Sequence, residues 1–419
     1  MFGIGFSIFS LLLGTALLLL GIGLQGTLLG LRAVEEGFAV SVIGYVMSAY
    51  FLGFALGIYL CPPLIRRVGH IRAYAAMAAI ASAAAIAFLL FINPYAWSLL
   101  RIITGACMVG LYMVVESWIN TLAPNHLRGQ FFSAYMVVTF VALALAQYLL
   151  LYADISGHSL FVLTSIFISF ALVPIALTRI EQPQQVITPK LHLPTVYAES
   201  PLGVVGTLTA GLVMGAFWGM MSVYCAKAGM DTTTTVLLIS STIIGGALLQ
   251  WPIGKLSDRV DRRLVISATA LIAATLALLN YLYIQDNSSL LYIAYFLYGG
   301  FAFSLYSLSV AHVNDRLQPE QALDASQTLL QLYGIGAVLG PIIAGVMMSQ
   351  LGYRSLLLLF TITLTTFGLF TLYRIYLRKA PAAEEQEPFI QMQISSPVVM
   401  EMDPRSDTQD EEVDSTGIA

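Results

Sequence analysis

Residues 234–284 read TTVLLISSTIIGGALLQWPIGKLSDRVDRRLVISATALIAATLALLNYLYI, two long apolar runs joined by a short charged segment. Each run is long enough to cross the hydrocarbon core of a bilayer as a helix, which takes about 20 residues. All six charged residues of the stretch lie between Lys255 and Arg263. The stretch therefore predicts a helical hairpin that crosses a membrane twice and turns in water.

The composition of the whole chain extends this prediction. Of 419 residues, 58% are hydrophobic and only 10% are charged, with a mean hydropathy of +0.82, whereas an ordinary soluble domain has about a quarter charged residues. Three widely spaced cysteines argue against a disulfide scaffold, and no Cys/His spacing suggests a metal site. A net charge of −4 without a basic stripe argues against nucleic-acid binding. We expect an all-α membrane protein without metal or cofactor.

Apolar segments of spanning length recur along the chain. Twelve are found, at about 7–30, 43–65, 73–92, 97–121, 131–152, 158–178, 203–226, 234–256, 264–284, 289–312, 326–349 and 355–376. They do not alternate as barrel strands do. The first is too long for a secretory signal and lacks its basic start, so we expect a retained helix.

The basic residues predict the orientation of these helices. With the N-terminus inside, the inner loops and tail hold Arg66, Arg67, Arg72, Arg128, Arg179, Lys190, Lys255, Arg259, Arg262, Arg263, Arg316, Arg374, Arg378, Lys379 and Arg405. The outer loops hold only Arg32, Lys227 and Arg354. We therefore expect both termini to be cytoplasmic.

The chain divides into two halves of six helices and a tail. Residues 1–178 and 203–379 form the halves, and a charged, proline-containing linker spans 179–202. Gly53 matches Gly245 at an offset of 192, and Gly105 matches Gly299 at 194, which suggests an internal repeat. Parallel repeats around a central site imply alternating access. Residues 380–419 carry ten acidic residues and one basic residue, and we expect a disordered acidic tail.

The charged segment between spans eight and nine carries a recognisable motif. Gly254-Lys-Leu-Ser-Asp258-Arg259-Val-Asp-Arg262-Arg263 closely resembles the G-x-L-x-D-R-x-G-R-R signature of the major facilitator superfamily, with Asp261 in place of a glycine. A degraded copy joins spans two and three, where Pro62 and Arg66 replace the first glycine and the aspartate. The resemblance implies twelve helices in two pseudo-symmetric six-helix bundles, and a protein that acts as a monomer.

Other segments are similar to one branch of that superfamily. Arg101-Ile-Ile-Thr-Gly105 resembles the pattern of its fourth helix, and Val114-Val-Glu116-Ser, Arg128-Gly-Gln130 and Gln250-Trp-Pro-Ile-Gly254 resemble the YcaD-type branch. The likeness runs from about residue 10 to 376. It implies a transporter in the bacterial cytoplasmic (inner) membrane but supplies no substrate.

The two motif segments predict a cytoplasmic gate. Its residues would be Arg66, Arg67, Gly69, Arg72, Gly254, Asp258, Arg259 and Arg262. Partly solvated charge pairs between them are strong enough to form and weak enough to open. The alternative is that these arginines only enforce the membrane orientation.

Two charged residues fall inside span four, where such groups are costly and face a cavity or a partner. Arg101 and Glu116 lie about 22 Å apart along the helix and share a face with Tyr112. Glu116 could pair with an arginine of the adjacent loop, carry a proton or bind solute, or only accept a local hydrogen bond. Arg101 could bind an anionic solute, respond to protonation, or anchor the helix near the outer interface.

Further polar residues could line a solute and proton pathway. Together with Arg101, Tyr112 and Glu116, the candidates are Gln25, Tyr50, Gln147, Trp218, Gln250, Tyr306 and Gln331. Each could equally serve as an interhelical hydrogen bond. Collectively they predict a cavity that is polar but nearly uncharged.

The leading functional hypothesis is a secondary active transporter of a small solute, coupled to protons. No G-x-x-x-x-G-K-[ST] motif supports ATP drive. One alternative is a multidrug or metabolite efflux antiporter, although the glycine-proline pattern of such antiporters stands in span eleven (Gly336–Gly345) and not in span five. The other is a membrane receptor or scaffold that acts through its tail. We expect no enzymatic activity, because no nucleophile–base arrangement can be recognised.

Overall fold

The computed structural model describes residues 2–124, 127–178, 183, 193–282, 288–317, 319–377, 389 and 395–398. Within these ranges the regular structure is helical throughout. The N-terminal half contains α1 (Phe2–Glu35), α2 (Val40–Val68), α3 (His70–Leu90), α4 (Pro94–Leu122), α5 (Arg128–Tyr148), η2 (Leu149–Leu151), α6 (Ser159–Phe170) and α7 (Leu172–Leu177). After the short α8 (Leu193–Glu199), the C-terminal half contains α9 (Pro201–Lys227), α10 (Thr232–Ser257), α11 (Arg262–Leu282), α12 (Ser288–Asn314), α13 (Pro319–Leu351) and α14 (Ser355–Leu377).

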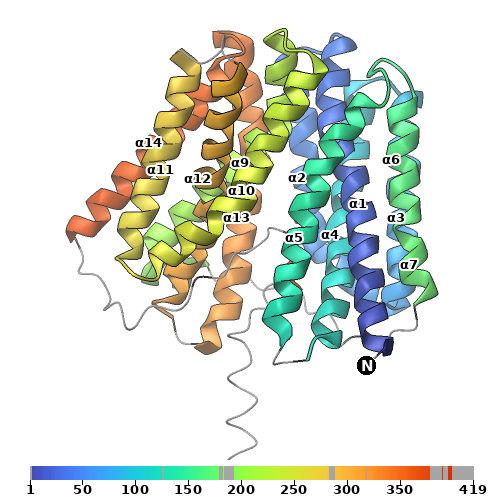
Figure 1. Cartoon of the computed structure of the whole chain (residues 1–419), viewed down its shortest axis with the longest axis horizontal. Helices are drawn as coiled ribbons and strands as arrows, with labels where there is room; N and C mark the ends of the chain where they lie inside the picture. The colour runs from blue at the N-terminus through green and yellow to red at the C-terminus, as the bar shows by residue number, and fades with distance from the viewer. Residues whose placement is uncertain are drawn as a thin grey trace, which may run out of the picture.

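The prediction of twelve spans is confirmed. Among the described residues, twelve helical segments are long and apolar enough to cross a membrane, and the sixth is formed by α6 and α7 together. Figure 1 shows α1–α7 on one side of the molecule and α9–α14 on the other, with the helices roughly upright. The sequence did not predict the short helix α8 within 179–202.

Close glycine contacts repeat between the two halves, as the sequence offsets suggested. In the N-terminal half a Cβ on Gly53 would overlap the carbonyl of Ile102, and one on Gly105 would overlap that of Tyr50. In the C-terminal half Gly245 meets Phe296 and Gly299 meets Thr242 in the same way. Each pair of partners differs by the same offset as its glycines, 192 or 194. The α2–α4 and α10–α12 crossings are therefore equivalent, which is the pseudo-symmetry expected of an internal repeat.

The two ends of the bundle differ in charge. One end carries Arg66, Arg67 and Arg72 at the α2–α3 turn and Arg259 and Arg262 at the α10–α11 turn, and we call it the arginine-rich face. The other end, the opposite face, carries Arg32 after α1, Lys227 after α9 and Arg354 before α14.

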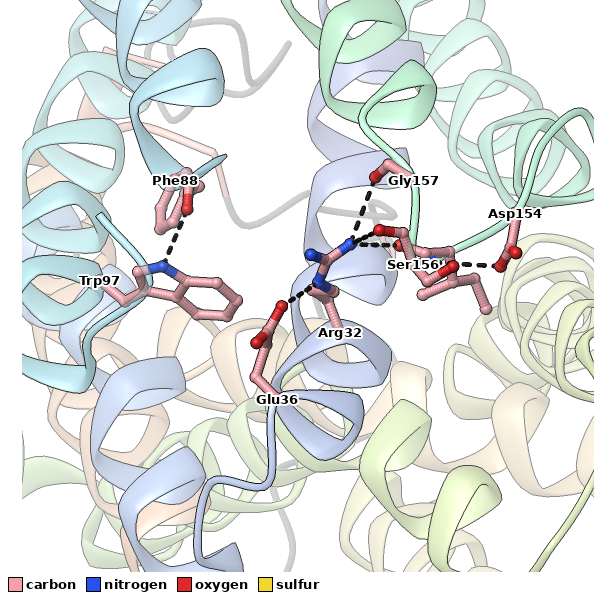
Figure 2. Close-up of polar contacts among 8 residues, drawn as sticks. Arg32, Glu36, Phe88, Trp97, Asp154, Ser156 and Gly157 are labelled. Carbon is pink, nitrogen blue, oxygen red and sulfur yellow. Dashed lines mark hydrogen bonds and ion pairs between the residues drawn. The ribbon is translucent and has the colours of Figure 1, made fainter. Parts of the chain in front are cut away.

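Polar contacts fix the loops of the N-terminal half at the opposite face (Figure 2). Arg32 at the end of α1 donates to Glu36 at 2.6 Å and to the carbonyls of Ile155, Ser156 and Gly157. These bonds tie the α1–α2 connection to the α5–α6 connection. Nearby, the indole of Trp97 donates to the carbonyl of Phe88 at 3.1 Å and joins α3 to α4.

The two halves meet through small residues near the opposite face. A Cβ on Gly44 of α2 would lie 2.5 Å from the Pro341 carbonyl oxygen of α13 and 3.0 Å from the Cα of Gly345. One turn away, Ser48 donates to the Val338 carbonyl at 2.5 Å. Helices approach this closely only where small residues line the contact. The α2–α13 contact therefore closes the bundle at this end.

Most of the acidic tail lies outside the described residues. Of 380–419, the structure describes Phe389 and 395–398. Residues Ser395 to Val398 are buried, and Phe389 packs against the core. The prediction of a disordered tail therefore concerns mainly residues that are not described, whereas the five described residues contact the helices.

Candidate functional site

A cavity of about 390 Å³ lies between the two halves. It is lined by α1, α2, α4 and α5 from one half and by α9, α10, α12 and α13 from the other. The lining is Ile22, Gly23, Gly26, Thr27, Tyr50, Phe51, Phe54, Ala55, Ile58, Tyr59, Arg101, Tyr112, Thr139, Phe140, Leu143, Met214, Trp218, Gln250, Phe303, Leu330, Gln331, Tyr333, Gly334, Ile335 and Ala337. This volume is in the range of small-molecule sites.

Six of the ten predicted pathway residues line this cavity. They are Tyr50, Arg101, Tyr112, Trp218, Gln250 and Gln331. The surrounding surface is aromatic and aliphatic, and Arg101 carries the only charge among the described lining residues. The expectation of a cavity with few charges is therefore matched by its described lining.

Arg101 is buried, with 4% of its surface exposed. Its guanidinium carbon lies 4.5 Å from the ring centroid of Tyr50. Its Nε has no hydrogen-bond partner, and no carboxylate among the described residues forms an ion pair with it. The ring of Tyr50 compensates part of the buried charge, and the remaining donors are available to a ligand.

Two glutamines add polar atoms to the wall. The hydroxyl of Tyr59 donates to Oε1 of Gln331 at 2.8 Å and so joins α2 to α13. Nε2 of Gln331 and Oε1 of Gln250 are buried without partners among the described residues. Buried polar atoms are usually satisfied, so these two atoms are candidates for contacts with a bound solute.

Four predicted pathway residues lie outside the cavity lining. Gln147 joins α5 to α1, because it accepts from Thr27 at 2.7 Å and donates to the Gly23 carbonyl at 3.4 Å. Gln25 is buried with both amide atoms unpaired among the described residues. Tyr306 packs edge-on against Tyr333, with ring centroids 5.2 Å apart. The fourth, Glu116, occupies a separate position.

Glu116 lies on α4 one turn beyond Tyr112, toward the arginine-rich face. It is fully buried. It accepts hydrogen bonds from the hydroxyl of Tyr135 on α5 at 2.7 Å and from Ser396 of the tail at 2.5 Å. Arg66, Arg67 and Arg72 are exposed, and none forms an ion pair with Glu116. The structure therefore does not bring together the pair that the sequence suggested.

The motif loop of the C-terminal half is held by ion pairs. Arg262 binds Asp315 at the end of α12 at 2.6 Å and Asp258 at 2.9 Å. Arg262 and Asp315 are buried, with 1% and 2% of their side chains exposed. Arg263 binds Asp261 at 2.8 Å. Burial raises the pKa of Asp261, but the hydrogen bonds and charge of Arg263 outweigh it, so the pKa lies below its usual value.

The other predicted gate residues are less engaged. Arg259 is exposed and forms no ion pair with a described residue. Gly69 takes a positive φ of 84° at the α2–α3 turn, a conformation that favours glycine. Lys255 lies over the ring of Trp251, 3.8 Å from its centroid. The structure thus assembles Asp258 and Arg262 into a network and leaves the other arginines exposed.

Sequence reasoning missed several residues of the site. Asp315 follows α12 and has no motif of its own, although its distance from Asn314 in the repeat could have drawn attention to it. Phe54, Phe303 and Tyr333 line the cavity but come from helices that are apolar all round, so no periodicity marked them. The contacts of the tail had no sequence signal, because its composition is that of a solvated segment.

Comparisons with known proteins agree with this architecture. The family model described as Major Facilitator Superfamily matches residues 11–322 and, in a second alignment, residues 203–402. A protein of Salmonella newport named uncharacterized MFS-type transporter YcaD is 29% identical over 349 residues, which cover 81% of this chain and 88% of that protein. A protein of the same name from Salmonella typhimurium matches equally well.

Two solved structures share the fold. A mutant of the nucleoside transporter NupG has a TM-score of 0.76 at 15% identity and covers 88% of this chain and 99% of its own. A bacterial homolog of the human lysosomal transporter Spinster, in an inward-facing and occupied conformation, has a TM-score of 0.73 at 13% identity and covers 91% and 97%. At these identities the likeness concerns the fold.

Proposed function

We propose that this chain, which belongs to the major facilitator superfamily, is a secondary active transporter that carries a small solute by alternating access and couples it to protons. Its membership and its twelve apolar helices make it a multi-pass protein of the bacterial inner membrane. The observation that carries the proposal is the cavity between the two halves, which both halves line with several helices.

The contacts between the halves support alternating access. At the opposite face α2 meets α13 through Gly44 and Gly345, and α1 meets α9 through Gly30 and Ser222. The cavity itself extends along α4 from Arg101 to Tyr112, toward the arginine-rich face. A transporter must release the contacts at one face and form them at the other. In our proposal the arginine-rich face is cytoplasmic, so this conformation is the inward-facing one.

Glu116 is the residue we assign to proton coupling. It is a buried carboxylate inside a membrane span, where a charged group is costly, and it lies one helical turn from the cavity. Its hydrogen bond from Tyr135 connects α4 to α5. Gain or loss of its proton would change the charge and the hydrogen bonds at this contact, and so bias the conformation of the N-terminal half.

Proteoliposomes test the proposal. The full chain is reconstituted, a pH gradient is imposed, and uptake of labelled nucleosides, sugars, amino acids and organic acids is measured. We expect accumulation of one chemical class that collapses when a protonophore removes the gradient. Glu116→Gln should abolish the pH dependence, whereas Glu199→Gln on the exposed short helix α8 should keep it. Uptake by Glu116→Gln with the wild-type pH dependence would contradict the role of Glu116.

A further inference from the structure

The buried guanidinium of Arg101 indicates what kind of solute the cavity takes. It is 4% exposed, lies in the cavity wall and has no carboxylate partner among the described residues. A buried charge without a counter-charge is costly, and the Tyr50 ring at 4.5 Å offsets only part of that cost. An anion from solution would complete the pairing.

The rest of the wall indicates the body of that solute. Nine of the 25 lining residues are aromatic, and none of the described ones is acidic. An ammonium group would therefore find no carboxylate to pair with, which disfavours amino acids and organic cations. The unpaired amide atoms of Gln250 and Gln331 leave room for about one or two neutral hydrogen bonds.

We propose that the solute is an organic anion, with one carboxylate or sulfonate bound by Arg101 and an aromatic or aliphatic body against the aromatic wall. This inference rests on the proposed function, because it takes the cavity as the transport site. Tyr112 lies roughly 16 Å further along α4 than Arg101, so the anionic group binds at the end of the cavity nearer the opposite face. The body then points toward the arginine-rich face.

Three probes with one body test the charge preference. Binding of 4-phenylbutyrate, 4-phenylbutyramide and 4-phenylbutylammonium to the purified full chain is measured by thermal shift and calorimetry. We expect the acid to bind about tenfold or more tightly than the amide, as a charge-assisted hydrogen bond implies, and the amine most weakly. Arg101→Gln should remove the difference between acid and amide. Lys227→Gln, which removes an exposed charge at the opposite face, should keep it.

Each result separates this inference from the proposed function. Equal binding of acid and amide to the wild-type chain, or no binding of the acid at millimolar concentration, overturns the organic-anion proposal, and this comparison needs no variant to fold. Uptake of the amide into proteoliposomes would then leave the transporter proposal intact. Arg101-dependent binding of the acid without any flux would instead keep the anion site and contradict transport.

A second, independent observation concerns the described part of the tail, Phe389 and Ser395–Val398. The amide of Phe389 donates to Asp258 at 2.8 Å, and its ring occupies the space where a Cβ of Gly254 would be. Ser396 donates to Glu116 at 2.5 Å, and Val398 is 2% exposed. The tail therefore contacts the C-terminal half at one point and the N-terminal half at the other.

Both contacts lie one helical turn beyond the cavity. Gly254 follows the lining residue Gln250 by four positions on α10, and Glu116 follows the lining residue Tyr112 by four positions on α4. In each helix this turn is on the side of the arginine-rich face. The tail is net −9, so its charge complements that face.

We infer that the tail segment is an autoinhibitory plug, which crosses the mouth of the cavity and holds both halves in this conformation. A solute entering or leaving through the arginine-rich face must displace it. Because the attraction between the tail and this face is electrostatic in part, raised salt weakens the contact. The burial of Ser395–Val398 supplies the remainder.

Cysteine accessibility tests the plug without any solute. The three native cysteines are buried, so a charged maleimide reports an introduced cysteine. In the full chain Ser396→Cys should react about tenfold more slowly than Glu199→Cys, because its site must open before it reacts. Adding Val398→Lys, which puts a charge into a buried position, should bring the two rates together. Val413→Lys, the same change at another tail position, should not.

Flux decides whether the plug inhibits. Val398→Lys and Phe389→Ala should raise the initial rate of uptake into proteoliposomes severalfold over wild type, and Val413→Lys should leave it unchanged. Labelling of Ser396→Cys as fast as Glu199→Cys in the full chain would show that the segment does not dock. An unchanged flux in a Val398→Lys chain whose tail is shown by labelling to be released would overturn the inhibition.

Discussion

The turn between α2 and α3 and the turn between α10 and α11 occupy equivalent places in the two halves, yet they treat charge differently. In the C-terminal half Arg262 is buried between Asp258 and Asp315. In the N-terminal half Arg66 and Arg67 are exposed, and neither forms an ion pair with a described residue. One end of the repeat is thus locked to its own bundle, and the other is not.

The repeat explains this difference residue by residue. At the offset of 192, Asp258 corresponds to Arg66 and Arg262 to His70, and at the offset of 194 Asp315 corresponds to Thr121. Both carboxylates that hold Arg262 are therefore missing from the N-terminal half. His70 instead packs its ring against Trp118, with centroids 5.9 Å apart. A repeat can keep its helix crossings while losing the charges at one of its ends.

Removing the buried arginine should produce the largest difference between the two turns. Arg262→Ala leaves Asp315 buried without its partner, and we expect a loss of about 3–5 kcal/mol in the free energy of unfolding. Arg66→Ala removes an exposed charge and should change it by no more than about 0.5 kcal/mol. Unfolding of both variants in detergent, followed by circular dichroism, measures the contrast. Equal losses would show that the two turns are not held differently.

Rebuilding the network in the N-terminal half should give a smaller effect. His70→Arg alone buries an unpaired charge and should cost about 1–3 kcal/mol. Adding Arg66→Asp and Thr121→Asp supplies the two carboxylates that the other half has, and should recover most of that loss. The same unfolding assay compares the single and triple variants. A triple variant no more stable than His70→Arg would mean that the two turns differ in backbone geometry, beyond their charges.

Acid should weaken the C-terminal turn through Asp261. Its pKa is below the usual value in the folded protein, so its contribution to stability is complete above the pKa of the unfolded chain, about 3.9, and is lost as the pH falls through the folded value. Because the pair is partly exposed, Asp261→Asn should cost only about 0.5–1 kcal/mol at pH 7. Melting curves from pH 7 to 3 should show this difference shrink toward zero. Glu199→Gln serves as the control, and a difference that is independent of pH would contradict the ion pair.

The sequence was sufficient for the architecture, because the physical signal is strong at that level. Twelve apolar runs of spanning length leave little freedom in a bilayer, and the glycine offsets marked the helix crossings that the structure shows at Gly53 and Gly245. Asp258 and Arg262 were found because their motif places them in one turn.

The facing of side chains was harder to predict. Gln147 and Gln250 look alike in sequence, but Gln147 joins two helices and Gln250 lines the cavity. Helices that are apolar all round give no moment to separate these cases. Asp315 is distant in sequence from Arg262, and Ser396 lies in a segment whose composition indicates no packing. Contacts of this kind depend on tertiary structure and have no local signature.

One experiment tests alternating access most directly. Cysteines at Ser48 and Val338, which are in hydrogen-bond contact across α2 and α13, are oxidised or joined by a short bifunctional reagent in proteoliposomes. Uptake of 4-phenylbutyrate, or of another compound that binds the purified protein, is then measured before and after reduction. Ser82→Cys with Ser165→Cys joins α3 to α6 within one half, where the two hydroxyls are 2.7 Å apart, and is the matched control. We predict that the first cross-link stops uptake and that reduction restores it, while the control transports throughout. A Ser48–Val338 cross-linked protein that transports at the uncross-linked rate would contradict alternating access through this contact.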